Sequence, residues 1–169
     1  MNTEPLRRPP FDHWPLHRAT PNMLLWRPSP GTLVTQAVIE CATLAAMEDV
    51  STGVDLLLEH DRPPEGGILI FHDWRRFQRY ESSAREHLLR RMRSRPKGYV
   101  RKTVVVVPPT PLWRMAIAGA NLIYAFLDVS APEVHTDIVK ARSSAQLYSA
   151  PAVGPDWFVN SAHASANAS

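Results

Sequence analysis

The stretch ILIFHD, residues 68–73, decides the fold class. It begins with four consecutive apolar residues, and a continuous apolar run of this kind is typical of a central strand that is covered on both faces. His72 and Asp73 close the stretch. A second apolar run, VVVV at residues 104–107, is the most strand-like segment of the chain and ends at two prolines. Both runs predict buried strands of a sheet.

Segments with a different periodicity alternate with these strands. Residues 43–60 carry apolar side chains near one side of a 3.6-residue period, which predicts an amphipathic helix. Residues 112–126 are apolar nearly all round, which predicts a buried helix. In chain order we predict strands at 23–27 and 33–40, a helix at 43–60, a strand at 68–71, a helix at 83–95, a strand at 104–107, a helix at 112–126, a weak strand at 129–134 and a helix at 137–146.

This alternation favours an α/β fold in which helices cover a mostly parallel sheet. We expect one domain at residues 23–146, with a mixed sheet of four or five strands and about four helices. The sheet is expected to be mixed because a Pro-Ser-Pro-Gly turn at residues 28–31 predicts an antiparallel hairpin at its start.

The two ends of the chain differ in composition from this domain. Residues 1–22 are broken by proline and predict a flexible arm, and residues 147–169 turn to Ala, Ser, Asn and Pro and predict a flexible tail. Two pairs of aromatic side chains could attach these ends to the body or to a partner: Phe11 with Trp14, and Trp157 with Phe158.

Composition narrows the classes of protein and site. The single cysteine, Cys41, permits no intrachain disulfide and no cysteine zinc site, which fits a reducing compartment. Residues 1–22 contain no apolar signal region, and the apolar stretch at 112–127 is shorter than the roughly 20 residues of a membrane span. We therefore expect a cytoplasmic protein with no membrane span, no metal and no cofactor.

Basic residues gather in one segment. Residues 75–102 hold eleven Lys or Arg side chains against only Glu81 and Glu86. One interpretation is a solvated helix face and loop, and the other is weak binding of an anion or an acidic partner. Reading of nucleic-acid bases is not expected, because no aromatic side chains are interleaved with the basic run at residues 90–97.

The segment FHDWRRFQRYESSAREHL, residues 71–88, resembles the signature region of the STAS domains of anti-sigma-factor antagonists. In that family a strand ends in Asp, and an Asp-Ser-Ser-Gly-Leu motif opens the next helix. Here Asp73 matches the strand end, Glu81 stands in place of the second Asp, and Ser82 and Ser83 match the serine pair.

A second likeness covers residues 23–145, which resemble small STAS-like proteins of bacteria, notably myxobacteria. The shared residues are His72–Trp74, Tyr80–Ser82 with Ala84 and Arg85, and Ala120–Leu122. The resemblance to the antagonists implies a STAS-like fold and phosphorylation of Ser82 by a partner kinase that is itself the anti-sigma factor. Ala84 and Arg85 stand where the antagonist motif has a glycine and an apolar residue, which would change the recognition surface.

The serine pair has two interpretations. A phosphate on Ser82 or Ser83 would lie at a helix N-terminus. Arg79 and Arg85 would stabilise it there, whereas Glu81 and Glu86 would repel it. Alternatively, Ser83-Ala-Arg-Glu86 is a capping box and the serines only cap the helix.

Two further features are weighed in the same way. His72 and Asp73 end a central strand, where α/β proteins build sites, but adjacent strand residues point to opposite faces and no nucleophile motif accompanies them. Structural roles are therefore favoured. The apolar side chains of the helix at 112–126 indicate either core packing or the lining of a lipid pocket: Trp113, Met115, Ile117, Leu122, Ile123 and Phe126.

These features favour a non-enzymatic regulatory module that binds another protein, either a kinase of the anti-sigma-factor kind or copies of itself. The expected contact residues are Asp73, Arg79, Glu81, Arg85, Trp157 and Phe158, with Ser82 and Ser83 as the switch. The alternative is a structural or assembly subunit whose two ends latch onto neighbouring chains.

Overall fold

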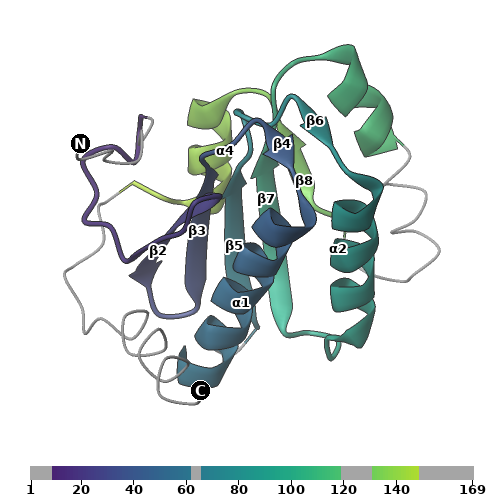
Figure 1. The fold of residues 1–169 in the computed structure, drawn as a ribbon. Coiled ribbons are helices and arrows are strands. Elements are labelled where there is room, and N and C mark those ends of the chain that lie inside the picture. Colours follow the sequence, from purple (N-terminus) through teal and green to yellow (C-terminus); the bar gives the residue numbers. More distant parts are fainter. Residues whose placement is uncertain (1–8, 62–65, 119–130, 149–169) are drawn as a thin grey trace.

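The computed structural model of the 169-residue chain describes residues 9–61, 66–118 and 131–148. A six-stranded sheet runs through its centre in the order β1-β2-β3-β5-β7-β8, and β4 and β6 form a separate two-stranded sheet (Figure 1). The strands are β1 (Arg18–Ala19), β2 (Met23–Ser29), β3 (Thr32–Ala37), β4 (Cys41–Ala42), β5 (Ile68–Asp73), β6 (Arg79–Tyr80), β7 (Val100–Val106) and β8 (Glu133–His135). The helices are α1 (Leu44–Asp61), α2 (Ser82–Ser94) and α4 (Ile138–Ala145), and residues 111–118 are also helical.

The predicted α/β class and mixed sheet are confirmed. β1, β2 and β3 pair antiparallel, whereas β3, β5, β7 and β8 are parallel neighbours. The main sheet has one strand more than the largest number expected, because β1 comes from the segment that was expected to be an arm. β8 begins directly after Pro132, since proline has no N–H to donate to a neighbouring strand.

The parallel connections follow from the alternation of strands and helices. α1 lies between β3 and β5 in the chain, and α2 lies between β5 and β7. Parallel neighbours need a long connection of this kind, because the chain must return to the same end of the sheet before the next strand begins. Gly67, directly before β5, cannot be replaced by a larger residue without strain. Its φ is +86°, and an added Cβ would lie 2.4 Å from the carbonyl oxygen of Gly98.

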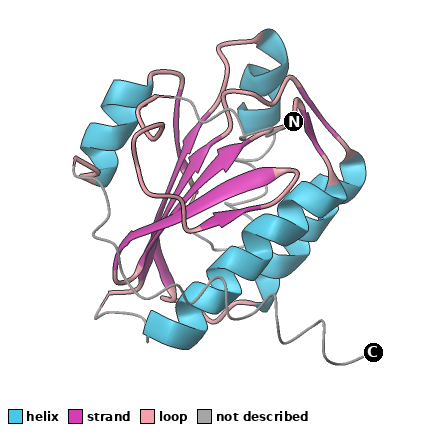
Figure 2. Ribbon diagram, turned by 60° about the vertical axis from the view of Figure 1, so that its left-hand side comes forward, coloured by secondary structure: helices cyan, strands magenta, loops and turns pink. Residues whose placement is uncertain are grey.

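Both faces of the sheet are covered (Figure 2). On one face α1 and α2 pack over alternate strand residues such as Ile70 and Val105. On the other face α4 and the chain around Phe11 pack over the residues between them, such as Phe71. The continuous apolar runs predicted as central strands have this cause, because each face of the strand meets a different core.

The expectation of a flexible arm at residues 1–22 is wrong for its described part, residues 9–22. Phe11 and Trp14 are fully buried, and the Phe11 ring lies 4.8 Å from that of Trp14 and 5.7 Å from that of Phe71. These two residues therefore do hold the segment to the body. Leu147, expected in the tail, is buried in the same core, and Trp157 and Phe158 lie outside the described residues.

Of the helices that fall within residues 9–61, 66–118 and 131–148, none is both long enough and apolar enough to span a bilayer. The apolar helix expected at 112–126 is described only as far as residue 118.

Candidate functional site

The start of α2 is fixed to the start of α1 by the small sheet. β6 pairs in parallel with β4, with Cys41 opposite Arg79, and the backbone N–H of Glu81 donates to the carbonyl of Ala42 at 3.0 Å. The Glu81 carboxylate also accepts a hydrogen bond at 3.4 Å from the backbone N–H of Leu44. The junction before α2 is thus held in place by the backbone pairing of β6 with β4 and by the hydrogen bond between the Glu81 carboxylate and the start of α1.

The predicted capping box is wrong. α2 begins at Ser82, so that Glu81 is the N-cap and Ser83 already lies in the first turn, where its hydroxyl cannot cap the helix. Glu81 itself makes no side-chain cap, and the Ser83 hydroxyl instead donates to the Glu81 carboxylate at 3.4 Å. The cause is β6, which keeps the chain extended through Tyr80 and leaves one residue before the helix.

The side chains expected to meet a partner are mostly at the surface here. Ser82, Arg79, Glu81 and Arg85 are exposed, and Ser83 is partly buried. Residues three apart on a helix share a face, so Arg85 lies beside Ser82. Within the described part of the chain the side chains of Ser82, Arg79 and Arg85 make neither a hydrogen bond nor an ion pair. The start of α2 therefore carries four of the predicted residues at the surface, and one of them, Ser82, has a hydroxyl without a hydrogen-bond partner in the described part of the chain.

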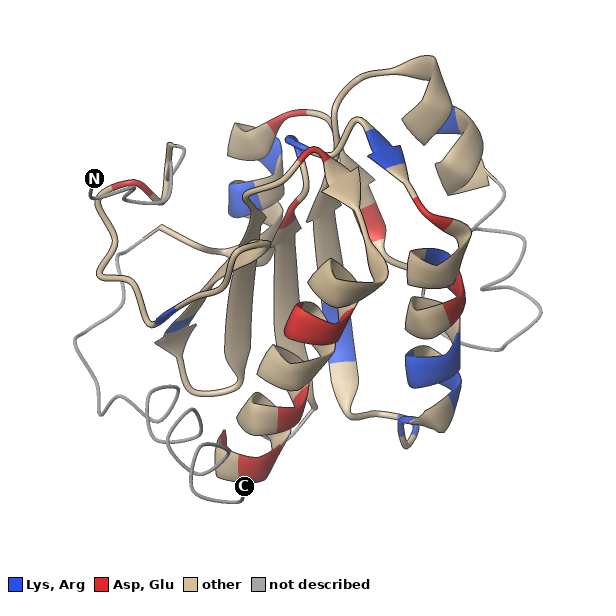
Figure 3. Ribbon diagram, in the orientation of Figure 1, with Lys and Arg blue, Asp and Glu red and all other residues tan. Residues whose placement is uncertain are grey.

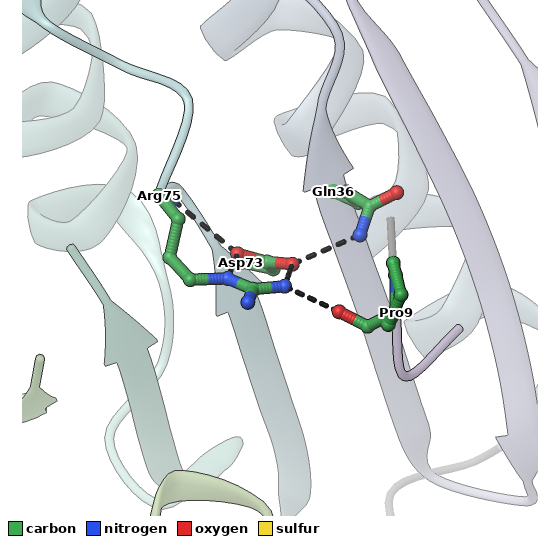
Figure 4. Close-up of polar contacts among 4 residues, drawn as sticks. All are labelled: Pro9, Gln36, Asp73 and Arg75. Atoms are coloured by element: carbon green, nitrogen blue, oxygen red, sulfur yellow. Dashed lines mark hydrogen bonds and ion pairs between the residues drawn. The ribbon is translucent and has the colours of Figure 1, made fainter. Parts of the chain in front are cut away.

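Asp73 does not belong to this surface, which corrects its assignment as a contact residue. Its carboxylate is 2% exposed and accepts hydrogen bonds from Gln36 Nε2 at 2.9 Å, Arg75 Nε at 2.8 Å and Arg75 Nη2 at 2.7 Å (Figure 4). Arg75 Nη2 also donates to the carbonyl of Pro9 at 2.6 Å. The hydrogen bond to Asp73 raises the pKa of Arg75, although partial burial opposes this. Asp73 therefore ties β3, β5 and the N-terminal segment together.

His72 points to the opposite face of the sheet, as strand geometry predicts. Its Nδ1 lies 2.8 Å from the Thr35 hydroxyl, and its ring stacks on Trp74 with the ring centroids 4.8 Å apart. Burial, with a smaller effect from the charge of Arg95, lowers the pKa of His72 to about 3, so the imidazole is neutral. His72 and Asp73 face different cores and do not form a catalytic pair with each other.

A partly open cavity of about 860 Å³ lies on the His72 side of the sheet and is lined by residues of α1, α2, β7, β8 and 112–117. Its walls are mainly apolar, and they include Trp113, Met115 and Ile117 of the helix for which a lipid pocket was the alternative interpretation. Trp113 is also part of the core, where its indole N–H donates to the carbonyl of Phe77 at 2.7 Å. Leu122, Ile123 and Phe126 lie outside the described residues.

The basic segment does not form a single patch. Arg75 is directed to the other face of the sheet by Asp73, whereas six cationic side chains line the cavity: Arg85, Arg91, Arg95, Lys97, Arg101 and Lys102. Acidic residues lie along α1 and basic residues along α2 (Figure 3). Sequence reasoning missed Arg95 because its position before Pro96 resembles an ordinary helix end. Its burial depends on elements distant in the chain.

Arg95 is the unusual member of this set. Its Nε is buried without a hydrogen-bond partner among the described residues, and burial lowers its pKa. The carboxylate that acts on it most strongly is Asp55, which already forms an ion pair with Arg91. Arg95 is partly exposed as a whole, but a buried donor without an acceptor is unfavourable, so its Nε marks a place where an acceptor is missing among the described residues.

A search of the models of known protein families and of curated proteins found no match to this chain, so its resemblance to STAS domains stays a prediction.

Proposed function

We propose that this protein is a regulatory module of the cytoplasm that binds another protein through the surface at the start of α2. The observation that carries the proposal is the exposed Ser82 hydroxyl, which lies free of hydrogen bonds to the described residues between two exposed arginines, Arg79 and Arg85. The resemblance of residues 71–88 to antagonist STAS domains supports the same surface.

The local geometry suits a contact surface. Backbone pairing between β4 and β6 fixes the junction before it meets a partner, so little conformational entropy is lost when a complex forms. Arg79 and Arg85 are free to pair with acidic groups of a partner, because no described carboxylate already neutralises them. Arginine is well suited to such contacts, since its planar guanidinium can bind a carboxylate through two parallel hydrogen bonds.

Phosphorylation of Ser82 would make this surface negative, because its two arginines, Arg79 and Arg85, are already balanced in number by Glu81 and Glu86. A phosphate adds a charge of about −1.5 to −2, which Arg85 can reach from one helical turn away. The phosphate would then occupy the arginines that a partner needs, while Glu81 and Glu86 would repel an acidic partner further. The proposed partner is therefore released when Ser82 is phosphorylated.

The test compares the proteins retained by tagged wild type, Ser82→Glu, Ser82→Ala and Arg85→Glu, quantified by mass spectrometry. Thr52→Glu is the matched control, because it adds the same charge at an exposed hydroxyl residue on α1. We expect one partner to be retained by wild type, Ser82→Ala and Thr52→Glu and to be depleted at least tenfold in the other two variants. Binding of the purified partner by calorimetry, with circular dichroism as a check on folding, then measures the same ratio directly.

Two outcomes would contradict the proposal. Equal retention of every partner by Ser82→Glu and Arg85→Glu would show that this surface contacts nothing. Retention only of further copies of the chain, unchanged by all four substitutions, would favour the assembly subunit instead.

A further inference from the structure

The cavity beside His72 has the size and lining of a small-molecule site. Its volume is about 860 Å³, and ligand sites are typically clefts of roughly 300–1,000 Å³ with mainly apolar walls and a few polar groups. The floor is formed by side chains such as Ile70, Val105 and Trp113 on the sheet and the facing helix. His72 adds no charge to this floor, because its imidazole is neutral.

The polar groups around the cavity are almost all donors or cations. Six Lys and Arg side chains line it, against a single carboxylate among its described lining residues, Glu133. Glu133 is already occupied, since it forms an ion pair with Lys102 at 2.7 Å and accepts a hydrogen bond from the Ser144 hydroxyl at 2.5 Å. The charge balance therefore favours an anion.

Three buried donors of the lining residues have no acceptor within the part of the chain that the structure describes: Arg91 Nε, Arg95 Nε and Trp74 Nε1. Arg91 has an ion pair with Asp55, whereas no carboxylate among the described residues forms an ion pair with Arg95. A carboxylate is acceptor-only and can accept two parallel hydrogen bonds from a guanidinium. A ligand with such a head group would satisfy Arg95 and leave its remaining atoms against the apolar floor.

We propose that this cavity binds a single-chain carboxylic acid, with the carboxylate at Arg95 and the hydrocarbon chain on the floor formed by Ile70, Val105 and Trp113. The cavity shares Arg85 with the protein-binding surface at Ser82, but the proposal rests on Arg95 and does not depend on that surface. Each methylene that leaves water contributes about 0.8 kcal/mol, so affinity rises with chain length until the cavity is filled.

The probes are dodecanoic acid, dodecanol and a dodecanoic acid that carries bromine on its terminal carbon, each added to the full-length protein below its aggregation concentration. We expect saturable binding of one dodecanoic acid per chain by calorimetry. The terminal bromine should quench tryptophan fluorescence more strongly than the unbrominated acid does, because Trp74 and Trp113 line the cavity.

Two pairs of variants locate the site. Arg95→Met keeps the length of the side chain but removes its charge, and we expect it to weaken the acid at least tenfold and to leave dodecanol unchanged. Arg93→Met is its control, because Arg93 is exposed on the same helix and does not line the cavity. Ala116→Trp fills the cavity and should weaken acid and alcohol alike, whereas Ala118→Trp, at an exposed position outside the lining, should not.

The proposal is overturned if folded wild-type protein binds no dodecanoic acid. It is equally overturned if Arg95→Met binds the acid as tightly as wild type does, or if Arg93→Met weakens the acid by the same factor. Loss of binding by Ala116→Trp supports the proposal only if circular dichroism and urea unfolding show that this variant has a native fold. If it does not fold, the comparison of Arg95→Met with Arg93→Met is the deciding test.

Discussion

Replacement of Asp73 by alanine tests whether this residue, at the end of the central strand, is an internal support and not a contact for a partner. The side chain is 2% exposed and accepts four hydrogen bonds: one from Gln36, one from the backbone N–H of Arg75 and two from the Arg75 guanidinium. Removal of the carboxylate leaves Arg75, whose side chain is 25% exposed, with only the carbonyl of Pro9 among the described acceptors.

The size of the effect follows from this geometry. Removal of one partner of a buried ion pair costs about 3–5 kcal/mol, because the remaining charge stays in a poorly solvated place. Typical domains are stable by only about 5–15 kcal/mol, so Asp73→Ala should remove a large share of the free energy of unfolding. For a chain of this length the midpoint of thermal unfolding should fall by on the order of 10 °C.

Urea unfolding followed by far-ultraviolet circular dichroism measures the change. Glu133→Ala is the matched control, because both side chains of the Glu133–Lys102 ion pair are more exposed, at 47% and 36%, and its loss should cost about 0–1 kcal/mol. A double-mutant cycle with Arg75→Ala should give a coupling energy of about 1–3 kcal/mol, since either single change strands the other charge.

A loss of less than about 1 kcal/mol in Asp73→Ala would refute the reasoning. So would a coupling energy near zero, which would mean that Asp73 and Arg75 contribute separately. In either case Asp73 would again be a candidate contact for a partner.

The remaining predictions concern the N-terminal segment and His72. Phe11→Ala should lower the free energy of unfolding by about 3–5 kcal/mol, because the ring is fully buried. The control is His13→Ala, at an exposed position two residues later, which should change it by less than about 0.5 kcal/mol. Equal small effects of the two variants in urea unfolding would mean that the segment is not docked. The pKa of His72 is lowered from 6.5 to about 3, so the unfolded chain binds one more proton than the folded chain between these values. Stability supplied by His72 is therefore present above pH 6.5 and is lost as the pH falls towards about 3, by up to about 1.4 kcal/mol per pH unit. His72→Gln should reduce this slope in urea unfolding between about pH 7 and pH 5, and an unchanged slope would contradict the assignment.

The sequence was sufficient for the fold class because the relevant signals are local. The apolar runs that become β5 and β7 record that both faces of these strands are covered, and the interposed helical periodicity predicts parallel pairing. The opposite orientations of His72 and Asp73 also follow from strand geometry alone.

Other features depend on pairings that local sequence does not record. Ser83-Ala-Arg-Glu86 fits the pattern of a capping box with Ser83 as the N-cap, yet the N-cap of α2 is Glu81, two residues earlier, because β6 pairs with the distant β4. The sequence marked Phe11 and Trp14 as possible attachments of the N-terminal segment, but it did not indicate where they attach. Phe11 packs against Phe71, sixty residues along the chain. The hydrogen bond from Gln36 to Asp73 likewise depends on the register of β3 against β5, in which the two residues lie opposite each other.

The candidate sites divide in the same way. The serine pair and its flanking arginines lie within seven residues, so a motif in the sequence was enough to predict that they share a surface. The cavity and the unpaired Arg95 are properties of tertiary structure. The cavity exists because α1, α2 and residues 112–117 cover the β7–β8 side of the sheet without filling the space beneath them. Arg95 has no ion pair among the described residues because Asp55 pairs with Arg91. A sequence pattern records which side chains are buried, whereas the volume left between them and the charge left unpaired are decided only when distant elements pack together.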